Sequence, residues 1–153
     1  MATEPARKAR FNHVAISVAP ELLDEAGRSA LLSFYGDVFG WDEMPTLTKD
    51  GELFVLRCGS NEQFVYLSGS KQPMRCPPLD HVGVSVGTPA ELDAMLERAR
   101  KRKERDPEVE IVKRGLDDFG MLKLHNFYVR YRLPLMFEVQ CFEWIKQEQE
   151  AST

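Results

Sequence analysis

Two of the three histidines in this chain occupy matching positions of an internal repeat. The segment 11–18, FNHVAISV, is echoed by the segment 79–86, LDHVGVSV, which begins 68 residues later (79 − 11 = 68). A repeat of this kind predicts two similar modules, each of which brings one histidine to a shared site. Because imidazole nitrogens are frequent ligands of divalent metals, the pair indicates a metal site that needs at least one further ligand.

The residues around each histidine predict which way its side chain points. Both segments alternate and are rich in β-branched residues, which is typical of strands. On such a strand His13 shares a face with Ala15 and Ser17, opposite the valines and isoleucine that would pack against a helix. His81 likewise shares its face with small residues. We therefore expect both histidines on a face with room for a ligand.

A glutamate on the last predicted strand could complete the site. Glu138 alternates with Phe137 and Val139 within residues 135–143, so it faces away from the apolar side of that strand. A carboxylate in the middle of a strand is costly to bury without a partner, and a metal ion would offset that cost. His13, His81 and Glu138 would form a two-histidine, one-carboxylate set with open coordination positions.

Three other residues are candidates for catalysis. Tyr66 occupies the position in the first half that Glu138 occupies in the second. A neutral phenol is a poor metal ligand, but it can donate a hydrogen bond or carry a proton. Tyr128 and His125 lie on the strand predicted for residues 122–130, and we consider both for a catalytic role.

The elements that would position these residues follow one plan twice. The first half predicts a strand (11–18), a helix (21–39) that Gly40 ends, and three strands (44–48, 52–58, 63–68). Residues 69–78 contain three prolines and form the predicted linker. The second half predicts a strand (79–86), a helix that Thr88 caps and that runs to about residue 105, and strands 108–114, 122–130 and 135–143. The pattern βαβββ occurs twice, which predicts an α+β fold.

Composition limits the function classes. A chain of 153 residues, 43% of them hydrophobic, fits one domain. The net charge of −4 argues against nucleic acid as a partner, and we interpret the basic run 97–105 as a solvated helix end. Three cysteines without paired spacing are typical of reduced thiols in the cytoplasm. We identify no secretory signal and no apolar stretch of the ~20 residues that a membrane span needs, so no membrane partner is expected.

The chain resembles the vicinal oxygen chelate superfamily, which includes glyoxalase I, bleomycin-resistance proteins and extradiol dioxygenases. The resemblance spans about residues 11–143, and the segments that carry it are 13–18 (HVAISV), 34–41 (FYGDVFGW), 79–84 (LDHVGV), 127–130 (FYVR) and 137–139 (FEV). The resemblance implies a single domain over 11–143, made of module 11–69 and module 79–143. These modules would form a cup-shaped mixed sheet, with flexible tails at 1–10 and 144–153.

The resemblance also implies a divalent metal held by His13, His81 and Glu138. Iron(II) is favoured, and manganese, zinc, nickel and cobalt are alternatives. Tyr66 stands where isomerases and epimerases of the superfamily often have a fourth ligand, which favours a dioxygenase that acts on a small aromatic or diol substrate. A glyoxalase-type lyase or isomerase and a non-catalytic binding protein of the bleomycin-resistance type are the alternatives. Relatives build the cup within one chain or by exchange between chains, and the proline-rich linker favours an exchanged homodimer.

Overall fold

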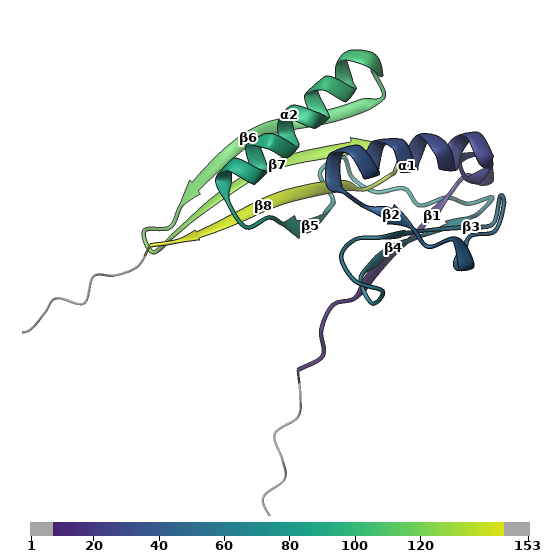
Figure 1. Cartoon of the computed structure of the whole chain (residues 1–153), viewed down its shortest axis with the longest axis horizontal. Coiled ribbons are helices and arrows are strands. Elements are labelled where there is room, and N and C mark those ends of the chain that lie inside the picture. Colours follow the sequence, from purple (N-terminus) through teal and green to yellow (C-terminus); the bar gives the residue numbers. More distant parts are fainter. Residues whose placement is uncertain (1–7, 146–153) are drawn as a thin grey trace, which may run out of the picture.

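The computed structural model describes residues 8–145, and it contains two four-stranded sheets (Figure 1). The first sheet has the order β1-β4-β3-β2, with β1 (His13–Val18), β2 (Asp42–Glu43), β3 (Leu53–Arg57) and β4 (Phe64–Gly69). The second has the order β5-β8-β7-β6, with β5 (His81–Ser85), β6 (Val109–Asp118), β7 (Leu122–Tyr131) and β8 (Met136–Trp144). Each sheet pairs its first strand in parallel with its last, so the repeat in the sequence is a repeat in topology. The predicted α+β fold is confirmed.

Two helices cover the same side of the sheets, α1 (Glu25–Phe39) over the first and α2 (Pro89–Arg105) over the second (Figure 1). The helix α2 begins with the predicted cap: Thr88 Oγ1 accepts from the Glu91 amide, and the Glu91 carboxylate accepts from the Thr88 amide, both at 3.1 Å. The helix α1 ends at Gly40, whose φ of 73° is the left-handed conformation that glycine adopts without strain.

Two boundaries predicted from the sequence are wrong. The helix expected over 21–39 is broken at Asp24, because the Asp24 carboxylate accepts a 2.7 Å hydrogen bond from the Gly27 amide and caps α1. Residues before it form the 3₁₀ helix η1 (Pro20–Leu23). The strand expected over 44–48 is instead the 3₁₀ helix η2 (Pro45–Leu47), since Pro45 has no amide hydrogen to give to a sheet. The strand that pairs with β3 is β2, which precedes η2 in the chain.

The two modules share one core in spite of the proline-rich linker. The Tyr35 hydroxyl donates to the Tyr131 carbonyl oxygen at 3.1 Å and lies 3.3 Å from the Tyr131 amide nitrogen, which donates to it. Arg98 of α2 donates to the Val38 carbonyl of α1 at 3.0 Å. Aromatic side chains from both modules stack around these bonds. The modules are therefore fixed to each other through their helix sides.

The sheet edges at β1 and β5 remain separate. Both strands lie at the edge of their sheets, and no ladder joins them among the described residues. A crevice of about 430 Å³ runs between them, and His13, Phe64, Gly83 and Ser85 are among the residues that line it.

The predicted tails fall mostly on residues 1–7 and 146–153, outside the described part, while Trp144 ends β8. Neither described helix is long and apolar enough to cross a bilayer.

Candidate metal site on the open face of the second sheet

Glu138 lies on the face of the second sheet that is turned away from α2, here called the open face. It is only 5% exposed, although it carries a carboxylate. Its Oε1 accepts hydrogen bonds from the Tyr128 hydroxyl at 2.8 Å and the Asn126 amide at 3.1 Å, and its Oε2 accepts from the Gln140 amide at 2.8 Å. These donors hold the carboxylate in one orientation and offset much of the cost of its burial.

His81 faces the same carboxylate from β5. Its Nδ1 lies 2.8 Å from the Leu79 carbonyl oxygen, which can only accept, so Nδ1 carries the proton. Nε2 then faces Glu138 Oε2 at 3.2 Å. If the imidazole were neutral, the lone pair of His81 Nε2 would face a lone pair of Glu138 Oε2. A cation at this contact removes that repulsion, either as a proton on Nε2 or as a metal ion bound to both atoms.

The spacing of this pair fits a shared metal ion. Two ligand atoms about 2.1 Å from one ion, separated by 90–109°, lie roughly 3.0–3.4 Å apart. The measured 3.2 Å falls within that interval. The hydrogen bond from Nδ1 to a backbone carbonyl also fixes the ring in the tautomer that presents Nε2, as in most metal-binding histidines. His81 and Glu138 therefore have the chemistry and the geometry of two adjacent ligands.

Tyr128 adds a phenol to this site. Its ring meets the His81 ring edge-on, with centroids 5.1 Å apart. Desolvation and the hydrogen bond to the Glu138 carboxylate raise the pKa of Tyr128 to about 12. The phenol thus keeps its proton at neutral pH and acts as a donor. Of the three catalytic candidates from the sequence, Tyr128 is the one that contacts Glu138.

Two amides of the site were not singled out from the sequence. Asn126 and Gln140 form one rung of the β7–β8 ladder, next to the rung of Tyr128 and Glu138. Gly115 on β6 makes space for Asn126, since a Cβ at that position would lie 2.6 Å from Asn126 Oδ1. Strand alternation places all of them on the open face, but nothing in the sequence says that their amides turn towards Glu138.

His13 does not join this pair within the chain. Its Nδ1 contacts the Asn12 side chain at 2.8 Å, and its ring stacks on Phe64 with centroids 4.9 Å apart. Among residues 8–145, no three His, Cys, Asp or Glu side chains lie close enough to hold one ion. Tyr66 pairs with Ala15 as Glu138 pairs with Gly83, so it does occupy the equivalent position of the first sheet.

His125 lies on the opposite side of the second sheet. It follows Leu124 and precedes Asn126 on β7, so its side chain points towards α2. Its Nε2 contacts Glu143 Oε2 at 2.8 Å and its Nδ1 contacts Arg114 at 3.0 Å. The structure thus pairs the buried His125 with two partly exposed charged side chains, Arg114 and Glu143, and separates it from Glu138.

Comparison with known proteins identifies the fold. No family model and no curated protein matches the sequence. Among solved structures, a lactoylglutathione lyase from Agrobacterium tumefaciens is similar at a TM-score of 0.59 and 20% identity, over 89% of this chain and 96% of that one. A glyoxalase/bleomycin resistance protein from Albidiferax ferrireducens is similar at 0.58 and 16%, over 86% and 98%. A fosfomycin resistance protein from Listeria monocytogenes is similar at 0.57 and 14%, over 88% and 94%.

At these identities the likeness establishes the fold and not the activity. It agrees with the twofold βαβββ topology and with the resemblance drawn from the sequence segments. This chain therefore has the fold of these glyoxalase/bleomycin resistance/dioxygenase proteins.

Proposed function

We propose that this chain is a metal-dependent enzyme whose substrate presents two neighbouring oxygen atoms, and that its reaction is ring cleavage of a catechol-like compound by oxygen. The observation that carries the proposal is the His81–Glu138 pair, with Nε2 and Oε2 3.2 Å apart. Tyr66, in the position equivalent to Glu138, adds no carboxylate and so leaves coordination positions for a bidentate substrate and oxygen.

The residues of the open face have separate roles in this proposal. His81 and Glu138 would hold the ion, and Asn126 and Gln140 would fix the carboxylate through its hydrogen bonds. A bound divalent ion, iron(II) being favoured, supplies Lewis-acid stabilisation of negative charge on the substrate oxygens. Tyr128, 2.8 Å from the carboxylate, would donate a proton or a hydrogen bond to the substrate.

The third ligand in this proposal is His13 of the partner subunit in a homodimer. Within one chain His13 is stacked on Phe64, and the crevice between β1 and β5 separates it from the Glu138 site. Both β1 and β5 lack a neighbouring strand on one side, where another chain can pair, although the Met74 amide already donates to the Ser17 carbonyl oxygen of β1 at 2.9 Å. A dimer in which the edge strands of two copies meet would bring His13 of the partner subunit to the Glu138 site and complete two sites together.

The shared site can be tested by mixing two inactive proteins. His13→Ala and Glu138→Ala protein would be unfolded gently, mixed and refolded, with wild type treated in the same way. A mixed dimer has one site with both defects and one site with all three ligands, so metal binding and activity should partly return. If wild type recovers while the mixture stays inactive, each site lies within a single chain.

The reaction is tested with a panel of catechols and iron(II) under controlled oxygen. Ring cleavage should consume oxygen and form a yellow product, and Glu138→Gln should abolish both. Isomerisation of hemithioacetals without oxygen uptake would instead assign a glyoxalase-type reaction.

A non-catalytic binding protein is the second candidate. Three neutral donors already satisfy Glu138, so its burial does not by itself require a metal. Such a protein would purify without metal and would bind a small aromatic ligand equally well in chelator.

A further inference from the structure

The open face of the second sheet changes character along its length. Successive rungs of β7 and β8 pair Tyr128 with Glu138, Asn126 with Gln140, Leu124 with Phe142, and Leu122 with Trp144. Because strand residues two apart share a face, all eight side chains lie on the open face. Two polar rungs at the proposed metal site are therefore followed by two apolar rungs towards the end of the sheet.

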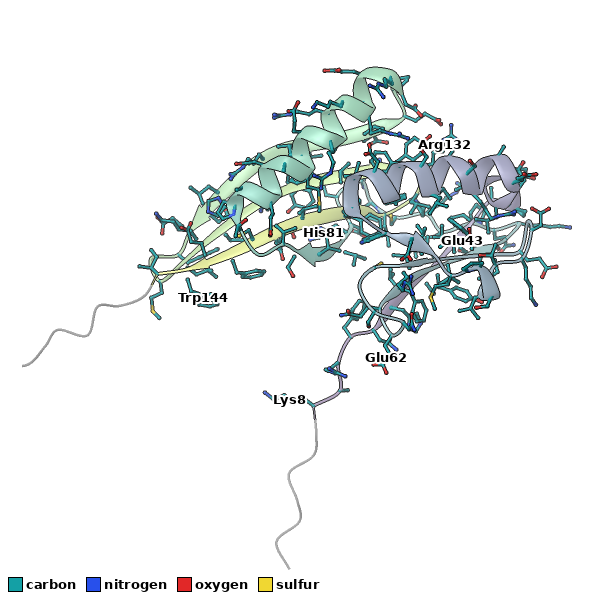
Figure 2. The ribbon with its side chains drawn as sticks, viewed as in Figure 1. Lys8, Glu43, Glu62, His81, Arg132 and Trp144 are labelled. Carbon is teal, nitrogen blue, oxygen red and sulfur yellow. The ribbon has the colours of Figure 1, made fainter. Side chains whose placement is uncertain are left out.

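These apolar rungs are exposed. Trp144 is 65% and Phe142 45% exposed, while their partners on β7, Leu122 and Leu124, are partly buried. Phe119, 66% exposed, joins them at the β6–β7 turn, where its amide donates to the Leu122 carbonyl. Figure 2 shows Trp144 on the side of the sheet away from α2. We call Leu122, Leu124, Phe142, Trp144 and Phe119 the apolar platform. Exposed aromatic clusters of this kind mark binding surfaces.

The position of the platform sets the size of what it can bind. Phe142 is four residues from Glu138 on β8, which corresponds to about 13 Å along the strand. At the other end of the open face, Arg130 of β7 is paired with Glu110 of β6 at 2.6 Å. On the platform side β6 contributes Asp117, the partner of Leu124, so the apolar path runs along β7 and β8. A ligand held at Glu138 can therefore extend an apolar group along these two strands towards Phe142 and Trp144.

We propose that the substrate carries an extended apolar substituent, an alkyl chain of about eight carbons or a second aromatic ring, that lies on the apolar platform while its two oxygens are held at His81 and Glu138. This inference rests on the proposed function, because it takes the metal site as the anchor. A small ligand is favoured over a second protein as the occupant because the platform continues, on the same two strands and the same face, from the residues that bind Glu138. Other exposed apolar residues at this end, such as Leu116 on the opposite face, do not belong to the platform.

The test measures binding and not turnover. The protein is loaded with zinc, which is redox-inert, and titrated without oxygen with catechol, 4-ethylcatechol, 4-butylcatechol and 4-octylcatechol. Each methylene that leaves water on the platform should tighten binding by up to about fourfold. Affinities are measured by isothermal titration calorimetry in every variant, because Trp144→Ser removes the exposed fluorophore. In proteins that keep Trp144, quenching or a blue shift of the exposed emission also reports the platform, since the other tryptophan, Trp41, is only 6% exposed.

Two variants and one control make the test specific. Phe142→Ser and Trp144→Ser should flatten the dependence on chain length and leave the affinity for catechol itself unchanged. Leu116→Ser removes an equally exposed apolar side chain from the other face and should leave the whole series unchanged.

The inference and the proposed function fail in different ways. If catechol binds only with zinc but the alkyl series is flat, the metal site stands and the platform inference is overturned. If octylcatechol binds equally well in chelator and Trp144→Ser abolishes binding, the platform stands without the metal anchor. If Trp144 is shielded from acrylamide at high protein concentration and becomes accessible on dilution, the platform is a contact between copies and the inference is wrong.

Discussion

Replacement of Gly115 by alanine should damage the Glu138 site although it removes none of the hydrogen-bonding groups of that site. A Cβ on residue 115 would lie 2.6 Å from Asn126 Oδ1, closer than real Cβ atoms come to any neighbour. Gly115 does not have a positive φ, so alanine itself suits the backbone there. The strain must therefore be relieved by moving the Asn126 amide, which is 8% exposed and donates to Glu138.

The expected cost follows from that hydrogen bond. A hydrogen bond to a charged group contributes about 1.5–3 kcal/mol. The glycine-to-alanine change by itself raises the free energy of unfolding by roughly 0.4–1 kcal/mol, because it restricts the unfolded chain. The net destabilisation should be about 1–2 kcal/mol, or roughly 2–8 °C in Tm for a domain of this size. Because Asn126 orients a proposed ligand, metal affinity should also fall, by about tenfold.

A double-mutant cycle with Asn126→Ala measures this coupling by chemical denaturation and metal titration. Once Asn126 is truncated, the Cβ on residue 115 has space, so Gly115→Ala should be neutral or slightly stabilising in that background. An equal cost in both backgrounds, or no cost in wild type, would refute the proposed contact between residues 115 and 126.

Three further outcomes follow from the same structure. The phenol of Tyr128, with its pKa raised to about 12, should ionise about two pH units later than the ordinary pKa of 10.0 in an absorbance titration. The unfolded chain loses this proton first, so the stabilisation is complete below pH 10 and disappears between pH 10 and 12. Asp24→Ala should cost about 0.5–2 kcal/mol in thermal unfolding because α1 loses its cap, whereas Asp37→Ala, exposed on the same helix, should cost much less. Tyr35→Phe should cost about 1–3 kcal/mol, since the buried Tyr131 amide would lose the hydroxyl that accepts its hydrogen bond, while the Tyr131 carbonyl oxygen would keep the bond from the Leu133 amide.

Periodicity predicted the repeated βαβββ order of elements, and the resemblance predicted the fold. Alternation in residues 11–18 and 79–86 predicted strands where β1 and β5 lie, and the Thr88 cap and Gly40 marked helix ends. The errors fell where local hydrogen bonding competes with periodicity. Asp24 interrupts an apolar pattern that continues through it, because its carboxylate accepts the hydrogen bond of the Gly27 amide. Pro45 turns an apparent strand into a 3₁₀ helix.

The candidate site was only partly predictable. Alternation places His81, Glu138 and Tyr128 on one face, but the turn of the Asn126 and Gln140 amides towards the carboxylate depends on side-chain packing around Gly115 and Gly83. The place of His13 depends on how two modules meet, which is a property of long-range contacts that strand patterns do not encode. His125 is a residue type that often occurs in metal and catalytic sites. Its place in the alternation of β7, one residue from Asn126, directs its side chain towards α2 and away from Glu138.

The chain offers a matched pair of variants for the central claim, because it contains two His–Glu contacts on opposite faces of one sheet. His81 and Glu138 are 3.2 Å apart on the open face, and His125 and Glu143 are 2.8 Å apart on the helix side. Metal content after equilibrium dialysis, measured by elemental analysis of wild type, Glu138→Gln and Glu143→Gln, compares them directly. We expect about one divalent ion per chain in wild type and Glu143→Gln, and at least a tenfold weaker affinity in Glu138→Gln. Undiminished metal binding in folded Glu138→Gln protein, or loss of metal only in Glu143→Gln, would contradict the assignment of the open face as the metal site.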